Sequence, residues 1–393
     1  MSENAKYSWV NALRGYAILL VILIHSAQSF SVFDYILKVS NSGYLGVQLF
    51  FILSSFTLFN SYSRRNSEDG KFVKSKFFIR RLFRIAPYYY TAMLIYILYR
   101  VLIKNESVNI KNIVANATFI NGVYLPAMIG NVPPGGWSIG VEMLFYLFIP
   151  LLFRYINSLK EAMFFLVLTL ILSFLINEFY FEFTVSVVNS IWENTNTYLF
   201  YFWLPNQFPI FALGIVLYFI NKEVLFSFKM GQVFLILSLG AFFILPFVED
   251  INQYSFNIIK KEYVYSIVFL FFAIGVYTTK NKYLNNSFIQ KIGIVSFSMY
   301  LNHFLLLIIL GYLYSGSIKF FVEYMHFSEL LFRNNIVFLI TYVIVVFLSY
   351  FVSQFTYEKV ELKGINLGKQ FISKFVNEKD SLCFSYPIKE EEK

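Results

Sequence analysis

The sequence predicts an all-α polytopic membrane protein, a bundle of about ten transmembrane helices with both termini in the cytoplasm. Of its 393 residues, 58% are hydrophobic and only 14% are charged, whereas a soluble domain has roughly 25% charged residues. Apolar runs of about 20 residues recur along the chain, and runs of this length suit helices that cross a ~30 Å hydrocarbon layer. These two observations exclude an ordinary soluble domain.

Ten spans are expected. The first run is longer than the apolar part of a signal peptide and is not followed by a small-residue cleavage site, so we expect it to be retained. The spans are placed at residues 10–30, 44–62, 85–103, 137–155, 161–178, 198–220, 230–248, 263–279, 292–314 and 335–355. They form one membrane-embedded domain at 1–356, followed by a polar, cytoplasmic tail at 357–393 that has no strong fold signal.

The charges between the spans predict the orientation. The connection at 63–84 holds eight basic residues, which places it in the cytoplasm by the positive-inside rule. The net charge of +9 is therefore explained by topology, and we expect no nucleic-acid partner because the basic residues do not form one soluble basic face. The single cysteine, Cys383, excludes an intramolecular disulfide, and no cluster of metal-binding residues is visible.

The first span carries two ionisable side chains in an otherwise apolar helix, Arg14 and His25. At ~100° and ~1.5 Å per residue they lie on nearly the same face, about 16 Å apart along the axis. Taken singly, each has an ordinary explanation, an interfacial anchor for Arg14 and a satisfied core histidine for His25. Together they point to function, since ionisable groups inside a membrane are costly.

Two other spans place polar side chains at membrane depth. Glu142 lies about one and a half turns inside the fourth span, at a depth comparable to His25, so a carboxylate and an imidazole are expected to meet there. The ninth span places Ser298, Asn302 and His303 near mid-membrane. The alternative is that these groups hold helices together by hydrogen bonds within the lipid, or that Glu142 forms a structural ion pair.

A third cluster is basic. Arg80, Arg81 and Arg84 lie at the cytoplasmic entry to the third span, where Arg81 and Arg84 are neighbours on the helix and are expected to form one basic cleft with Arg14. Guanidinium groups grip phosphate oxygens in pairs, so this cleft suits a phosphate-rich ligand. Basic residues that flank a span also occur for topology and for contact with lipid headgroups alone.

The sequence resembles the acyltransferase-3 family of membrane-embedded acyltransferases that modify bacterial surface glycans. Five blocks follow the family's order, and a sixth, weaker block is FTYEKVELKGINLGK. The five are the element from Arg14 to His25, GYLGVQLFFILSSF, RRLFRIAP, GGWSIGVEMLFYL and VSFSMYLNHF. Two positions depart from the family pattern, Asn302 where an aromatic residue often precedes the histidine and Val360 where proline is usual.

The resemblance implies that residues 1–356 are an acyltransferase domain of the bacterial inner membrane. Its donor would be acetyl-coenzyme A or another acyl-coenzyme A, and its acceptor a hydroxyl of a glycan or lipid-linked sugar such as O-antigen, capsule or exopolysaccharide. A stand-alone form without a fused SGNH-type domain is expected, with membrane lipids as surroundings and no metal. The implied residues are His25, Glu142 and Ser138 for catalysis, Arg14, Arg81 and Arg84 for the donor, and Tyr300 and His303 for the substrate.

The expected mechanism follows from this arrangement. The arginine cleft holds the phosphates of coenzyme A, and the thioester arm reaches into the bundle toward His25. His25 removes the proton of the attacking hydroxyl, and Glu142 orients the imidazole. A covalent variant, in which Ser138 or His25 carries the acyl group, stays open.

Two other classes of protein compete with this interpretation. A transporter or flippase of a glycan intermediate also uses polar groups at mid-membrane, but the sequence has no inverted repeat and no matching pair of interrupted spans. A purely structural subunit of a polysaccharide machine would not respond to substitution of Arg14 or His25 except in stability.

Overall fold

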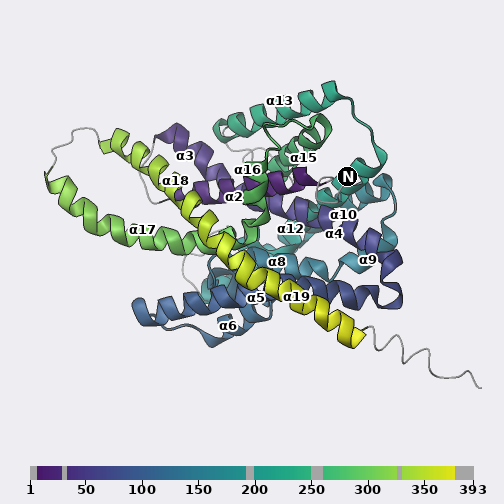
Figure 1. Cartoon of the computed structure of the whole chain (residues 1–393), viewed down its shortest axis with the longest axis horizontal. Helices are drawn as coiled ribbons and strands as arrows, with labels where there is room; N and C mark the ends of the chain where they lie inside the picture. The colour runs from purple at the N-terminus through teal and green to yellow at the C-terminus, as the bar shows by residue number, and fades with distance from the viewer. Residues whose placement is uncertain (1–6, 29–32, 192–198, 249–259, 325–329, 377–393) are drawn as a thin grey trace, which may run out of the picture.

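The computed structural model describes residues 7–28, 33–191, 199–248, 260–324 and 330–376. Over these ranges the chain forms helices and no strand, which confirms the predicted all-α class (Figure 1). The α-helices are α2 (Ser8–Ala27), α3 (Asp34–Asn41), α4 (Gly46–Glu68), α5 (Val73–Leu98), α6 (Ile110–Ala117), α7 (Leu125–Ile129), α8 (Gly136–Tyr146), α9 (Ile149–Tyr155), α10 (Leu159–Ile191), α11 (Leu199–Phe202), α12 (Leu204–Glu223), α13 (Phe228–Ile244), α15 (Lys261–Thr279), α16 (Ser287–Ile294), α17 (Ser296–Tyr324), α18 (Leu330–Thr356) and α19 (Leu362–Phe371). The short 3₁₀ and π turns are η1 (Ser42–Leu45), η2 (Gly70–Phe72), η3 (Tyr99–Ile103), η4 (Ile120–Gly122), η5 (Leu245–Phe247), η6 (Tyr357–Glu361) and η7 (Ile372–Val376).

Among the described residues, 7 helices are long and apolar enough to cross a membrane, or up to 9 if each of two bent pairs is one span. Seven to nine spans make a multi-pass membrane protein, while the expected number of ten stays a prediction. The expected third span falls in α5 and η3, which are helical throughout but are not counted among the nine. This segment combines several tyrosines with arginines, and both lower its hydropathy.

Two spans that the sequence suggested as straight helices are broken. The expected fourth span consists of α8 and α9, bent by 47°, and the expected ninth span consists of α16 and α17, bent by 76°. Pro150 in the first turn of α9 explains the first break, since proline cannot donate the backbone hydrogen bond that would continue α8. The breaks place Ser138 and Glu142 on α8, and Tyr300 and His303 in the first turns of α17.

Helix α2 lies in the interior of the bundle. It packs against α4, α16, α17 and α18, and most of its apolar side chains are fully buried. Helix α4 in turn packs against α12, and α12 packs against α10 and α15. Because α2 is surrounded by protein, Arg14 and His25 face other helices and not the lipid.

The chain after Tyr357 is helical as far as Val376, which its sequence did not indicate. Residues 335–374 form one continuous helical stretch, visible in Figure 1 as a long rod formed by α18 and α19. Helix α19 packs against α5. The hydropathy pattern missed this docking because the residues that α19 buries are glycines, Gly364 and Gly368.

Candidate active site

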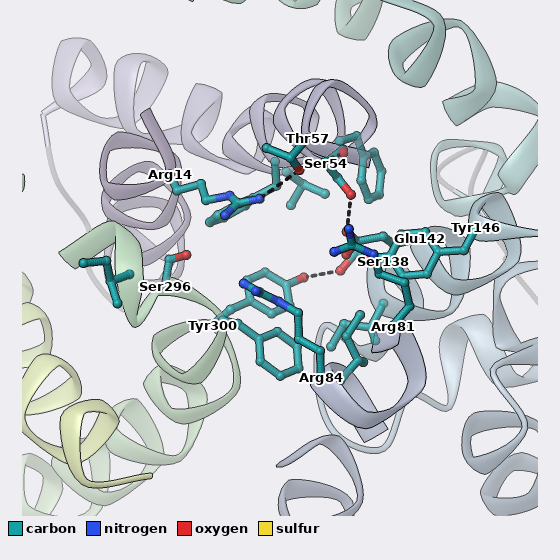
Figure 2. A pocket seen from close by; sticks show the side chains of 17 residues that line it. Arg14, Ser54, Thr57, Arg81, Arg84, Ser138, Glu142, Tyr146, Ser296 and Tyr300 are labelled. Atoms are coloured by element: carbon teal, nitrogen blue, oxygen red, sulfur yellow. Dashed lines mark hydrogen bonds between the residues drawn. The ribbon is translucent and has the colours of Figure 1, made fainter. Parts of the chain in front are cut away.

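A cavity of about 100 Å³ lies where α2, α4, α5, α8 and α17 converge. Figure 2 shows side chains from these helices reaching into it. We call it the inner cavity. Six of the residues predicted from the sequence line it together: Arg14, Arg81, Arg84, Ser138, Glu142 and Tyr300.

The three arginines enter the inner cavity from two helices. Arg14 on α2 donates to Thr57 Oγ1 at 3.2 Å, and Arg81 on α5 donates to Ser61 Oγ at 2.8 Å. The Arg81 Nε is buried and has no hydrogen-bond partner among the described residues. A buried N–H donor without an acceptor is costly, so this guanidinium is suited to receive an anion.

Glu142 is the carboxylate of the inner cavity. It accepts a hydrogen bond from Tyr146, one turn later on α8, at 2.7 Å, and another from Ser54 on α4. One carboxylate therefore faces three guanidinium groups among the residues that line the cavity. The surplus of positive charge favours a negatively charged ligand.

Ser138 and Tyr300 close one side of the inner cavity. Ser138 Oγ donates to the Tyr300 hydroxyl at 2.9 Å, and both hydroxyls lie within 3.1 Å of the Gly135 carbonyl. Gly135 has a φ of 76°, which favours glycine, and a Cβ there would lie 2.8 Å from the Tyr300 hydroxyl. The turn before α8 thus places its carbonyl against the tyrosine.

A second, larger pocket of about 560 Å³ adjoins the first at its basic end. We call it the vestibule. Arg81 and Arg84 line both spaces. Seven of the residues that line the vestibule are basic, against one carboxylate, Asp69, which pairs with Arg80. The basic residues are Arg64, Arg65, Lys76, Arg80, Arg81, Arg84 and Lys369.

His25 and His303 form a separate cluster that does not line the inner cavity. Their ring centroids are 5.4 Å apart, and both rings pack on Phe304. The Tyr300 ring lies 5.8 Å from the His303 ring, so Tyr300 lies between the inner cavity and the histidine pair.

The Nδ1 atom of each histidine faces an oxygen. His25 Nδ1 is 3.1 Å from the amide oxygen of Gln28, and His303 Nδ1 is 3.1 Å from the Met299 carbonyl. A backbone carbonyl only accepts, so Nδ1 of His303 carries the proton and its Nε2 keeps a lone pair. His303 is fully buried and its Nε2 has no partner among the described residues. In His25 the Gln28 oxygen beside Nδ1 favours the tautomer in which Nε2 keeps its lone pair.

The expected meeting of Glu142 with His25 is not found. Glu142 bonds to Ser54 and Tyr146, whereas His25 bonds to Gln28. The depth of a residue in the membrane can be counted along the sequence, but it does not say which faces of two helices are turned toward each other. For this reason the predicted contact of Glu142 with His25 was wrong. Gln28 was missed although its position three residues after His25 on the same helix was a usable signal. Ser54 lies in a block already quoted for the resemblance, but no role was assigned to it.

The sequence led us to expect no metal site, and the described residues can be searched for groups of metal-binding side chains. Within the ranges that the structure describes, no group of three or more metal-binding side chains is found. The chemistry offered by the inner cavity is that of guanidinium, hydroxyl and carboxylate groups.

Comparisons with known proteins show to which family the chain is similar. The acyltransferase-3 family model, described as an acyltransferase domain, matches residues 7–357. The chain is 28% identical over 317 residues to "Putative acetyltransferase ORF330" of Acidianus two-tailed virus, covering 79% of this chain and 88% of that protein. It is 24% identical over 170 residues to "Peptidoglycan O-acetyltransferase OatA" of Listeria monocytogenes, covering 38% of this chain and 25% of that protein. No solved structure matches the chain.

Proposed function

The chain belongs to the acyltransferase-3 family, and from that premise we propose that it transfers an acyl group, most simply acetyl, from acyl-coenzyme A to a hydroxyl of a cell-surface glycan. The observation that carries the proposal is the pair of adjoining spaces with Arg81 and Arg84 in the lining of both. A donor with phosphates at one end and a thioester on a long arm fits a basic vestibule that leads into a narrower cavity.

The donor enters from the cytoplasm in this proposal. The vestibule lies among the basic ends of α4 and α5, and the positive-inside rule assigns such ends to the cytoplasm. Arg81 and Arg84, which line both spaces, hold the phosphates by charge-assisted hydrogen bonds, with the unpartnered Arg81 Nε as one donor. Arg14 adds its positive charge from the inner cavity. The proposed membrane is the inner membrane of a bacterial cell.

His25 acts as the base toward the acceptor. Its Nε2 takes the proton of the sugar hydroxyl while the hydroxyl oxygen attacks the thioester carbonyl. A carbon–oxygen bond forms, the carbon–sulfur bond breaks, and the imidazolium returns its proton to the departing sulfur. The products are the glycan ester and free coenzyme A. Gln28, and not Glu142, holds the imidazole in the required tautomer.

Direct transfer is favoured over an acyl-serine intermediate. Ser138 is hydrogen-bonded to a tyrosine hydroxyl and a backbone carbonyl, and neither is a base able to remove its proton. In this proposal Tyr300, which lines the inner cavity, contacts the acyl arm. His303 is fully buried beside His25, and its contact with the substrate stays a prediction.

The acceptor is proposed as a glycan because one relative is named for peptidoglycan O-acetylation. That protein supports the class of acceptor and not a particular polymer. O-antigen, capsule, exopolysaccharide and peptidoglycan sugars all present the hydroxyl that the reaction needs.

The test is transfer of labelled acetyl from acetyl-coenzyme A to glycan in inverted membrane vesicles of cells that make the acceptor. His25→Ala is expected to abolish transfer at equal protein level, because the base is lost. Arg14→Ala is expected to raise the KM for the donor about tenfold, which corresponds to about 1.4 kcal/mol.

Arg154→Ala is the matched control, since Arg154 is exposed and lines neither space. It is expected to leave transfer unchanged. Full transfer by His25→Ala would overturn the role of this histidine. Movement of glycan across the membrane without consumption of donor would replace the acyltransferase by a transporter.

A further inference from the structure

The helix after the last expected span is docked by two glycines. A Cβ at Gly364 would lie 2.6 Å from Pro87 Cγ and 2.8 Å from the Phe83 carbonyl oxygen. At Gly368 it would lie 2.7 Å from Phe83 Cβ. Spaced four apart, the glycines form one smooth stripe on α19 that lets the backbones of α19 and α5 approach closely. The position of α19 against α5 is therefore specific.

A buried carboxylate fixes the start of this helix. Glu361 is 1% exposed and accepts a hydrogen bond from Ser298 on α17. A buried carboxylate is costly unless it is hydrogen-bonded, so this contact ties η6 and α19 to α17. Ser298 lies two residues before Tyr300, which closes the inner cavity.

Docked in this way, the C-terminal helical segment forms a wall of the vestibule. Ile365 and Lys369 of α19 and Ile372 of η7 line it together with Arg80 and Arg81 of α5. Their spacing of four and three places them on one helical face. The ammonium of Lys369 thus adds to the basic side chains of α4 and α5 around one space, although α19 lies outside the residues that the family model matches.

We propose that α19 is part of the donor site and that Lys369 binds a phosphate at the nucleotide end of the acyl donor. This inference rests on the proposed function and extends it to a segment outside the family domain. The vestibule is the larger of the two spaces, which suits the bulky nucleotide, while the narrow inner cavity suits the thin thioester arm. The C-terminal helix then determines how tightly the donor is held and takes no part in the acyl transfer itself.

The test is calorimetric titration of coenzyme A, and of adenosine 3′,5′-diphosphate as its nucleotide end alone, into the full-length protein in detergent. Lys369→Ala is expected to weaken binding of both ligands about three- to tenfold, the range for one lost charge-assisted contact. Lys369→Arg is expected to retain binding. Lys369 is exposed, so the variants are expected to fold, and their melting temperatures check this.

Lys363→Ala is the matched control, because Lys363 is an exposed lysine of the same helix that does not line the vestibule. It is expected to bind both ligands as the wild type does. Equal affinities for Lys369→Ala and Lys363→Ala would overturn the role of α19 and leave the proposed function standing. A wild-type protein that binds neither ligand would overturn the coenzyme A donor itself.

Discussion

Arg14 and His25 on α2 are each hydrogen-bonded to an uncharged side chain. His25 bonds to Gln28 and Arg14 bonds to Thr57. A neutral partner orients a side chain without cancelling its charge or removing its lone pair. We expect the amide of Gln28 to favour the tautomer of His25 in which Nε2 is basic, as a carboxylate does in a Ser-His-Asp arrangement.

Replacement of Gln28 tests this tautomer. Gln28→Ala is expected to lower kcat about tenfold, equivalent to about 1.4 kcal/mol, because the imidazole then samples the wrong tautomer. The KM for the donor is expected to be unchanged, since Gln28 does not line the vestibule. Gln28→Glu keeps an acceptor oxygen and is expected to restore most of the rate.

Initial rates of acetyl transfer at saturating donor give this comparison. Gln354→Ala is the matched control, because Gln354 is an exposed glutamine on α18 whose side chain bonds to Tyr350, one turn earlier on the same helix. If Gln28→Ala and Gln354→Ala had the same kcat, Gln28 would have no role in orienting the imidazole of His25.

For single residues, the sequence predicted correctly which side chains lie together when both belong to the same helix. Arg81 and Arg84 were expected together because one turn separates them, and both line the inner cavity and the vestibule. The pairing of Glu142 with His25 failed because it depended on which helices are neighbours. Depth in the membrane can be counted along a sequence, but the rotation of α8 about its own axis cannot.

The sequence predicted where helices occur better than it predicted where they bend. Hydropathy detects an apolar stretch but is insensitive to a bend, so α16 and α17 were expected as one span although they are bent by 76°. Proline marks the other break, between α8 and α9. The docking of α19 left no hydropathy signal because its contact with α5 is made by glycines.

A substitution at Gly364 tests the docking of α19. Gly364→Leu is expected to separate α19 from α5, since its side chain would collide with Pro87 and the Phe83 backbone; overpacking of this kind costs about 1–3 kcal/mol. Limited digestion with trypsin is the measurement, because Lys363 and Lys369 lie on α19. Cleavage there is expected to be faster than in the wild type.

The control is Gly240→Leu on α13, where an added Cβ meets nothing within 4 Å. It introduces the same side chain without a collision and is expected to leave the digestion pattern unchanged. Resistance of Gly364→Leu equal to that of Gly240→Leu would contradict close docking of α19.

For the whole molecule, the charges between the helices predict on which side of the membrane the C-terminus lies. The chain has a single cysteine, Cys383, near its C-terminus. A membrane-impermeant maleimide is expected to label it in inverted vesicles and not in intact spheroplasts, since the basic connections belong in the cytoplasm. Labelling after detergent solubilisation shows that the thiol is reactive, and labelling in intact spheroplasts would reverse the orientation.

Tyr300 is expected to matter for the ion permeability of the membrane as well as for the reaction. Under the proposed function, the protein binds its donor from one face of the bilayer and its acceptor from the other, so it must let both in without conducting ions. The Tyr300 ring is held by Ser138 and the Gly135 carbonyl, and we expect it to block the passage of ions at this point. Tyr300→Ala is expected to make proteoliposomes leak protons under a pH gradient, measured with an entrapped dye, whereas Tyr300→Phe keeps the ring and is expected to hold the gradient.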